Sequence, residues 1–367
     1  MRHDIRLISS QFKIFGDFVS AEPYGTGHIN DTYLAIYNQG GAVGRYIHQR
    51  INHGVFRNPV GVMENIVRVT QHVQRKLTGC GVQDLSRRVL TLIPTHSQLP
   101  YYLDPAGNYW RTYVFVEGAQ SYDAVKNVEQ AYRVAYAFGF FQKMLEDFPP
   151  PRLHETIPDF HNTPKRFAAF EKAIEADRCN RAKSASREIE FVFERKKITE
   201  LLIGLQKGGE ILERVTHNDT KLNNVLIDNK SGEGLCIIDL DTVMPGLSLY
   251  DFGDMVRTTT SPALEDEKDL SKVYMQMPMF EALAKGYLTA IGDSLTKTER
   301  KYLAFSGKLI TFEIGIRFLT DYLEGDIYFT VHRDGHNLDR CRTQFKLVES
   351  IEQQEERMNR LVDTLFQ

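Results

Sequence analysis

Short apolar runs separated by polar, glycine-containing turns dominate the first 116 residues. Such runs predict strands when they are rich in β-branched and aromatic residues. We expect strands over residues 18–24, 32–37, 46–51, 89–93 and 109–116. A helical stretch opens at Pro59 and continues to Leu77. This part of the chain is therefore predicted to be a small, sheet-rich unit.

Beyond Gly118 the pattern changes to helical spacing. Asn127 can cap a helix, with Gln130 three residues later, and apolar residues then recur at helical spacing from Ala131 to Leu145. Further helices are expected over about residues 188–206, 270–291, 298–323 and 337–365. A compact β-rich segment, residues 215–243, lies between the predicted helices at 188–206 and 270–291. The second part of the chain is thus predicted to be mainly helical.

The order of these elements indicates the fold class. A sheet-rich N-terminal lobe, a short hinge at Glu117-Gly118 and a large helical C-terminal lobe are typical of the bilobal, protein-kinase-like α+β fold. We place the lobes at residues 1–116 and 117–367. A length of 367 residues suits a two-lobed enzyme better than one small core.

Composition narrows the class of partner. Hydrophobic residues make up 42% of the chain and charged residues 25%, which is ordinary for a soluble globular protein. The net charge of -3 argues against nucleic acid or an anionic membrane as the main partner. The four cysteines lie far apart, which argues against a zinc site and a disulfide framework. With no apolar leader over residues 1–12 and no membrane-length apolar run, we predict a cytoplasmic location.

The segment from Val215 to Asp228 carries the strongest chemical signal. His217, Asp219 and Asn224 have the spacing H-x-D-x-x-x-x-N, which is that of a kinase catalytic loop. The carboxylate of Asp219 can accept the proton of an attacking hydroxyl. The amide oxygen of Asn224 can return to the same site and coordinate Mg²⁺, because the intervening loop is short and polar.

A predicted strand pair, residues 225–227 and 235–238, follows this loop and ends at Asp239. A carboxylate there can bridge a metal ion to the β- and γ-phosphates of a nucleotide. Asp251-Phe252-Gly253 spells the D-F-G of protein kinases, but it lies too far from Asp219 and does not end that strand. We therefore assign the metal to Asp239 and interpret Asp251 as structural, either capping a helix or bonding to the catalytic loop. Asp241 is a second acidic candidate.

The alternative for these residues is a polar turn and hairpin that share the spacing by chance. Motif, hairpin and lobe order agree, which disfavours that alternative. The glycines Gly25 and Gly27 form a G-x-G loop that could lie over nucleotide phosphates. A lone G-x-G is more often a hairpin turn, and Asn30 replaces the third glycine, so both interpretations of this loop stay open.

Residues 217–228 and 237–246 resemble the aminoglycoside phosphotransferase/choline kinase superfamily. Within it the chain is most similar to the N-acetylhexosamine 1-kinases, over residues 22–25, 27–30, 263–272, 317–319 and 321–329. The catalytic motifs specify the superfamily, and the later signatures specify the sugar-kinase branch. The resemblance implies transfer of the γ-phosphoryl group of ATP, with Mg²⁺, to the anomeric hydroxyl of N-acetylglucosamine or N-acetylgalactosamine.

The resemblance also implies roles for individual residues. Asp219 would be the base and Asn224 and Asp239 the metal ligands. The candidates for binding the sugar are His28, Asn30, Arg317 and Tyr328. In the wider superfamily the third strand carries an ATP-binding lysine, and here Gln49 stands at that position. The predicted nucleotide contacts are Gly25, Gly27, Gln49 and the hinge residue Glu117.

Each sugar-site candidate has a structural alternative. Arg317 could pair with Asp321, four residues later on the same helix. His28 could be a turn residue, and Tyr328 could belong to the core. With the resemblance we favour substrate contact for Arg317, because a guanidinium fork suits vicinal hydroxyls.

Two rival functions also follow from the sequence. The first is a kinase of the same superfamily for an aminoglycoside, choline or homoserine, although Arg317 and His28 argue against a polycationic acceptor. The second is a catalytically inactive module that binds sugar or nucleotide. The missing lysine favours that module, whereas the intact set of Asp219, Asn224 and Asp239 argues against it.

Overall fold

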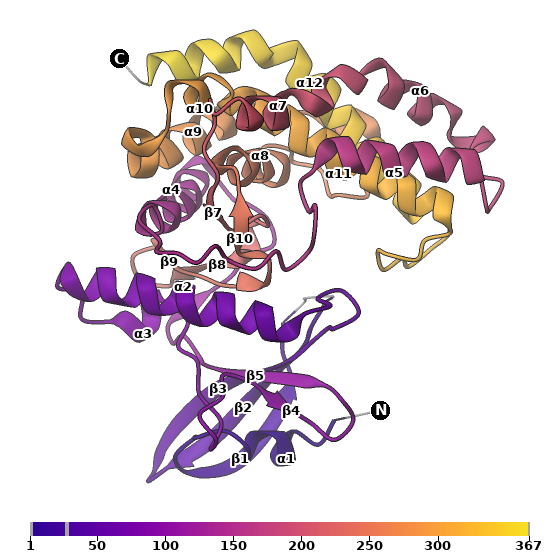
Figure 1. The fold of residues 1–367 in the computed structure, drawn as a ribbon. Helices are drawn as coiled ribbons and strands as arrows, with labels where there is room; N and C mark the ends of the chain where they lie inside the picture. The colour runs from indigo at the N-terminus through magenta and orange to yellow at the C-terminus, as the bar shows by residue number, and fades with distance from the viewer. Residues whose placement is uncertain (1–2, 26–28, 366–367) are drawn as a thin grey trace.

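The computed structural model describes residues 3–25 and 29–365, and it has two parts (Figure 1). A small sheet lies at the bottom of the view, a larger helical assembly lies above it, and a long helix runs between them. The first part contains α1 (Ile5–Ser9), β1 (Asp17–Pro23), β2 (Asp31–Gln39), β3 (Ala42–Ile51), α2 (Pro59–Gly79), α3 (Leu85–Arg88), β4 (Tyr102–Leu103) and β5 (Tyr109–Val114). The α+β, protein-kinase-like architecture predicted from the sequence is confirmed.

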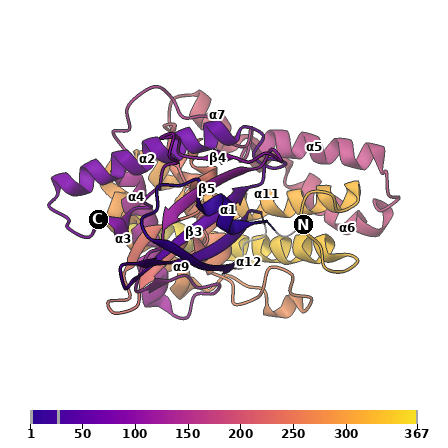
Figure 2. The same ribbon diagram turned by 90° about the horizontal axis from the view of Figure 1, so that it is seen from below.

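The small part is built on a five-stranded antiparallel sheet with the order β1-β2-β3-β5-β4. Seen from below, this sheet lies in front of the helices of the large part (Figure 2). Trp110 points to the face covered by α1, where it packs with Phe12 in a small buried cluster. Its neighbour Arg111 points to the opposite face because side chains alternate along a strand. The register pairs Arg111 with Gln49 of β3.

Most predicted elements of this part are confirmed. Strands β1, β2, β3 and β5 and helix α2 occupy the expected places. The strand predicted over residues 89–93 is wrong, because only Leu92 forms a bridge, to Tyr113. This segment runs beside β5 and donates one bond from the Ile93 amide to the Thr112 carbonyl at 2.9 Å. The ladder stops there since Pro94 has no N–H to donate.

The large part contains β6 (Ala119–Gln120), α4 (Val128–Met144), α5 (Thr163–Ala176), α6 (Ser186–Glu194), α7 (Leu201–Lys207), β7 (Arg214–Thr216), β8 (Val225–Asp228), β9 (Gly234–Ile237), β10 (Met244–Gly246), α8 (Ser248–Thr259), α9 (Met277–Ile291), α10 (Lys297–Lys301), α11 (Leu303–Glu324) and α12 (His336–Thr364). As predicted, Asn127 caps α4, accepting from the Gln130 amide at 2.9 Å. The change from strand-rich to helix-rich structure lies between β5 and α4.

Some predicted helices have different limits. The helix expected over residues 188–206 is broken into α6, a 3₁₀ segment and α7. Arg195 lies at the break, stacked on the Phe191 ring at 3.6 Å and paired with Glu352 of α12. The third helix, expected from residue 270, begins at Met277, and the fourth is divided into α10 and α11. Tertiary contacts such as that of Arg195 therefore set boundaries that the helical period does not.

The helices α8 and α11 pack closely against each other in the core of the large part. Gly253 of α8 makes this possible, because a Cβ at this position would lie 2.5 Å from the carbonyl oxygen of Ser306 on α11. Helix α8 carries Asp251, and α11 carries Arg317. The close seam therefore joins two elements that carry candidate functional residues.

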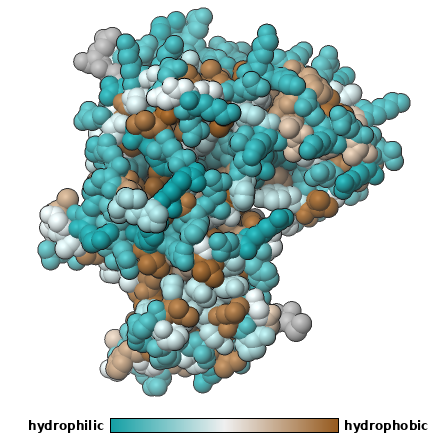
Figure 3. Space-filling model, viewed as in Figure 1, coloured by the Kyte–Doolittle hydropathy of each residue, from teal (hydrophilic) through white to brown (hydrophobic). Residues whose placement is uncertain are grey.

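Hydrophilic residues cover most of the face seen in Figure 3, and hydrophobic residues are scattered over both parts and at the narrow waist between them. The helices of the described residues include none with the length and apolar character needed to cross a bilayer.

Candidate active site

The catalytic loop, residues 216–224, connects β7 to β8 and is anchored by Asp251 of α8. One carboxylate oxygen of Asp251 accepts from the His217 amide at 3.0 Å, and the other accepts from the Asn218 amide at 2.7 Å. The Thr220 hydroxyl donates to the Asp251 carbonyl at 2.6 Å. The structural role predicted for Asp251 is confirmed in the form of bonds to the catalytic loop.

His217 joins this loop to the strand that ends at Asp239. Its Nε2 donates to the Ile238 carbonyl at 2.9 Å, because Nδ1 accepts from the Asp219 amide at 3.3 Å. The Ile238 amide in turn donates to the Asn224 carbonyl at 2.9 Å. The loop and the end of the β8–β9 hairpin are therefore held together by side-chain and backbone bonds, as the predicted order of loop and hairpin requires.

Asp219 contacts two other polar residues of the loop. The Asn224 amide group donates to the Asp219 carbonyl at 2.8 Å and to its Oδ2 at 3.1 Å. Lys221 Nζ lies 2.8 Å from Oδ1. Burial alone would raise the pKa of Asp219, but the charge and hydrogen bond of Lys221, together with the charge of Arg257, outweigh it and lower the pKa. The carboxylate is therefore ionised at neutral pH, as a proton acceptor must be.

Asp239 follows β9 in a left-handed backbone conformation, with φ of 57°. Part of its side chain faces solvent. Desolvation by the surrounding protein and repulsion from the carboxylates of Asp241 and Asp219 raise the pKa of Asp239 to about 6. Such mutual repulsion shows that three carboxylates are gathered here, and a cation bound among them would be stabilised.

The donor set of this site suits a hard divalent cation. No group of three His, Cys, Asp or Glu side chains that could hold a metal occurs in residues 3–25 and 29–365. Asn224 and Asp239 offer an amide oxygen and a carboxylate. Mg²⁺ usually takes only one or two protein ligands and completes its shell with phosphate oxygens and water. The pair therefore fits magnesium held jointly with a nucleotide.

Asp241 is buried and contacts residues of the small lobe. Its Oδ2 accepts from Asn30 Nδ2 at 2.6 Å, and its Oδ1 pairs with Arg111. Arg111 Nε also donates to the Gln49 side chain at 3.0 Å. Asn30 accepts from the Asn52 amide at 3.0 Å. Both groups of the Asn30 amide are thus bonded within the protein, and the second acidic candidate holds the lobes together.

The other predicted nucleotide and sugar residues of the small lobe have different surroundings. Gly25 follows β1 in a left-handed conformation, with open space where a Cβ would lie. Gly27 and His28 lie outside the described residues. Glu117 is exposed and forms a two-point ion pair with Arg45, at 2.8 Å for each N–O contact. This carboxylate supports the hinge in the structure.

Arg317 does not pair with Asp321, which was the structural alternative considered from the sequence. Asp321 accepts from three backbone amides, those of Ile327, Tyr328 and Phe329, at 2.7 to 2.9 Å. It thereby shapes the α11–α12 loop, residues 325–335. The Arg317 guanidinium lies instead over aromatic rings, at 4.9 Å from the centre of Phe160, 5.8 Å from Tyr328 and 5.6 Å from Phe329.

His161 connects this aromatic cluster to the catalytic loop. Its Nε2 lies 3.0 Å from the Asn218 carbonyl oxygen, next to Asp219 in the chain. Its Nδ1 lies 2.7 Å from a carboxylate oxygen of Glu313, one turn before Arg317 on α11. His161, Lys221 and Arg111 were not predicted. For Lys221 the signal was available, since a cation two residues after Asp219 falls inside the catalytic motif.

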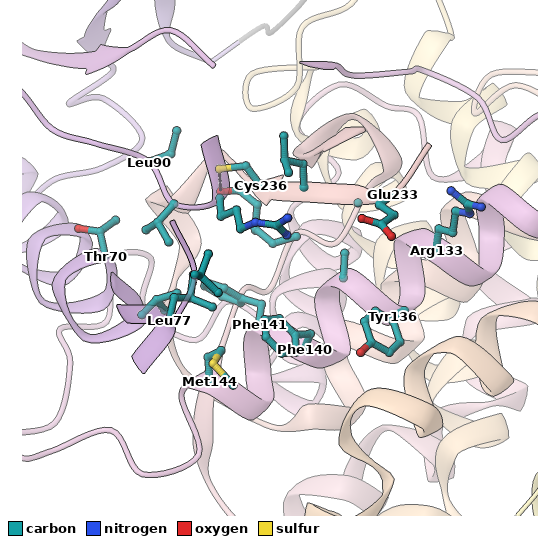
Figure 4. Close-up of a pocket in the computed structure, with 18 of the residues that line it drawn as sticks. Thr70, Leu77, Leu90, Arg133, Tyr136, Phe140, Phe141, Met144, Glu233 and Cys236 are labelled. Atoms are coloured by element: carbon teal, nitrogen blue, oxygen red, sulfur yellow. Dashed lines mark hydrogen bonds between the residues drawn. The ribbon is translucent and has the colours of Figure 1, made fainter. Parts of the chain in front are cut away.

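A pocket of about 530 Å³ lies behind β9, between α2 and α4 (Figure 4). Apolar side chains such as Leu77, Phe141 and Met144 gather in it, and Arg133 and Glu233 lie together at one end. It adjoins the catalytic centre only through Ile237 and Leu240, and none of Asp219, Asn224 and Asp239 lines it. A charged triphosphate does not suit this apolar lining, so the pocket is not where we place the chemistry.

Residues 20–289 match the phosphotransferase enzyme family. The chain belongs to this family. Phosphotransferases with solved structures share the fold at low sequence identity. A microcompartment-associated aminopropanol kinase has a TM-score of 0.58 and 14% identity over 97% of this chain and 99% of its own. An ethanolamine kinase from Plasmodium vivax has a TM-score of 0.56 and 12% identity over 89% of this chain and 82% of its own. A choline kinase from Cryptosporidium parvum has a TM-score of 0.53 and 14% identity over 95% of this chain and 93% of its own.

Proposed function

We propose that this phosphotransferase is an N-acetylhexosamine 1-kinase, which transfers the γ-phosphoryl group of ATP to the anomeric hydroxyl of N-acetylglucosamine or N-acetylgalactosamine. The similarity of residues 263–272 and 317–329 to the sugar-kinase branch supports this acceptor. The observation that carries the proposal is the cationic character of the region beside the catalytic loop. Arg317 lies there among three aromatic rings.

A second arginine strengthens this argument. Arg166 donates from Nε and Nη2 to the Phe160 carbonyl at 3.2 and 3.0 Å. Burial and repulsion from Arg317 lower the pKa of Arg166. Neither arginine forms an ion pair with a carboxylate of the described residues. The buried Glu313 carboxylate nearby is bonded to His161 and Thr163. Both arginines therefore keep N–H groups that the hydroxyl and amide oxygens of a neutral sugar can accept from, and they disfavour a cationic amino alcohol or aminoglycoside.

The residues of the catalytic loop can perform the transfer. Asp219 is ionised, so it can accept a hydrogen bond from the attacking hydroxyl and then its proton. The Asn224 amide group, which donates to Asp219, fixes the direction of the carboxylate. Lys221 places a positive charge beside the position where the γ-phosphoryl group would be transferred. Positioning and charge neutralisation of this kind provide most of the catalysis in phosphoryl transfer.

Magnesium bound by Asn224 and Asp239 would neutralise phosphate charge and orient the triphosphate. The raised pKa of Asp239 indicates how strongly its carboxylate is disfavoured without a cation nearby.

The decisive experiment measures ADP release with Mg-ATP and a panel of acceptors. The panel contains N-acetylglucosamine, N-acetylgalactosamine, glucose, choline, ethanolamine and kanamycin. We expect turnover with the N-acetylhexosamines and a ³¹P NMR signal of a sugar 1-phosphate. Turnover only with the amines would refute the proposed acceptor, and a phosphate on another hydroxyl would refute the proposed position.

An Asp219→Asn variant serves as the control for mechanism. Loss of a general base costs about 10² to 10⁴ in rate. We expect that loss in kcat, while binding of the sugar, measured by calorimetry, is retained. Near-normal turnover in this variant would remove Asp219 from the mechanism.

A further inference from the structure

A buried ion pair crosses from the small lobe to the segment that follows Asp239. Arg111 of β5 and Asp241 form this pair, and their side chains are only 1% and 2% exposed. Asp241 belongs to a 3₁₀ turn, η4 (Leu240–Thr242). Asn30 and Gln49 complete the group, bonded to Asp241 and to Arg111 respectively. Strand β5 and the residue before β2 thus contact one carboxylate of the large lobe, and β3 holds Arg111 through Gln49.

The same turn is bonded to the catalytic loop by the residue next to Asp241. The Thr242 hydroxyl donates to the His217 carbonyl at 2.8 Å, and Asn218 Nδ2 donates to the Thr242 carbonyl at 2.9 Å. Asp239 lies immediately before η4. A displacement of the small-lobe sheet would therefore be transmitted through η4 to both Asp239 and the catalytic loop.

The position of Arg111 in the sheet is fixed by its neighbour on β3. The β3–β5 register places Arg111 directly beside Gln49, whose side-chain oxygen accepts from Arg111 Nε at 3.0 Å. Burial alone would lower the pKa of Arg111, but the charges of Asp241 and Asp239 raise it, so the guanidinium stays charged. A buried ion pair contributes little net stability over apolar residues of the same size, which leaves positioning as its distinct effect.

We infer that Arg111 is a positioning residue of the nucleotide and metal site, because it fixes η4 to the small-lobe sheet. Arg111 acts through Asp241, since its buried guanidinium is not open to a ligand. This inference rests on the proposed roles of Asn224 and Asp239 and is independent of which acceptor is phosphorylated.

The first test replaces Arg111 by Met. We expect the affinity for mant-ATP in the presence of Mg²⁺, measured by fluorescence titration, to fall at least about tenfold, and kcat/KM for Mg-ATP to fall about 10²-fold, because a displacement of about 1 Å has that cost. Arg111→Lys keeps a positive charge and should bind mant-ATP more tightly than Arg111→Met. Equal affinities for the two variants would overturn the role of the charge.

A double variant separates positioning from folding. Arg111→Met with Asp241→Leu removes both buried charges, a replacement that usually preserves folding. We expect a melting temperature near that of the wild type together with the nucleotide defect of the single variant. Wild-type affinity and kcat in the double variant would overturn the inference.

The matched control is Lys76→Met. Lys76 of α2 pairs with Asp147, which follows α4, at 2.6 Å, and this is another ion pair between the two parts of the chain. Its loss should leave mant-ATP affinity unchanged, and a defect as large as that of Arg111→Met would overturn the special role of η4.

The mant-ATP titration also distinguishes the two proposals. Wild-type protein that binds mant-ATP but phosphorylates no N-acetylhexosamine would refute the proposed acceptor, while the comparison of the Arg111 variants would still stand. Failure of the wild type to bind mant-ATP with Mg²⁺ would overturn both.

Discussion

The catalytic loop and the α11–α12 loop are held in different ways. In the catalytic loop Thr216, His217 and Asn218 are buried, and two successive backbone amides bond to Asp251. In the α11–α12 loop Ile327 is 75% exposed and Tyr328 53%, and Asp321 organises the backbone. The groups of the chemical step are thus fixed by bonds buried in the core, whereas the bonds that hold the proposed acceptor region are partly exposed.

The largest effect should come from breaking the anchor of the catalytic loop. Asp251→Asn replaces a double acceptor by a group that presents an N–H to the amides of His217 and Asn218. A buried unsatisfied group costs about 1–3 kcal/mol, so we expect roughly 3 kcal/mol less stability in urea unfolding. We also expect kcat to fall by about 10² or more because the loop shifts.

The control for Asp251→Asn is Asp293→Asn, at an exposed position, which should change neither the stability in urea unfolding nor kcat. A stable, fully active Asp251→Asn protein would contradict the comparison, because the loop would then be held by other contacts.

A smaller loss is expected from Lys221→Met, which removes a charge from the site and leaves its anchor intact. A hydrogen bond to a charged group is worth about 1.5–3 kcal/mol, which predicts roughly a 10- to 100-fold decrease in kcat. Because Lys221 is 43% exposed, stability should change by less than about 1 kcal/mol. Steady-state kinetics should also show an unchanged KM for the acceptor, and a rise in that KM instead would place Lys221 in acceptor binding.

Asp321→Asn tests the other side of the comparison. It weakens the bonds that shape the α11–α12 loop, so we expect the acceptor KM to rise roughly tenfold with a loss of about 1–3 kcal/mol in stability. The value of kcat should stay close to that of the wild type. Glu324→Gln, on the exposed end of the same helix, is the matched control. A kcat defect with unchanged acceptor KM would reverse the roles assigned to the two loops.

The smallest effect is expected at Ile327. Ile327→Ser replaces an exposed apolar side chain, and surface substitutions usually change stability by about 0.5 kcal/mol or less. Both kcat and the acceptor KM should remain within about twofold of wild type. A larger rise in KM would show that Ile327 covers the bound acceptor.

The catalytic-loop residues, which lie close together in the sequence, were predicted as one group, whereas the contact between Arg111 and Asp241 was not. Asp219, Asn224 and Asp239 belong to one loop and the hairpin behind it, where short connections fix their geometry. The pair of Arg111 and Asp241 joins residues 130 positions apart. No local spacing encodes such a contact, because it depends on how the two lobes are packed.

The fold follows the same division. The helix α4 was predicted from its cap and its apolar period, both of which are local. Helix α5 was missed although Asn162 caps it and Pro164 lies in its first turn, so a signal was present in the sequence. The break at Arg195 left no such signal, since Glu352 of α12 supplies its partner.

The absence of a side chain at Gly253 has a consequence for how new specificities can arise in this family. Because the backbones of α8 and α11 touch where Gly253 meets Ser306, the distance between Asp251 and Arg317 is held by rigid helix packing. A descendant that accepted a bulkier molecule could not increase this distance without disrupting the packing of α8 against α11. Its adaptation would have to come from residues 325–335, where Ile327 and Tyr328 are exposed and lie outside this core.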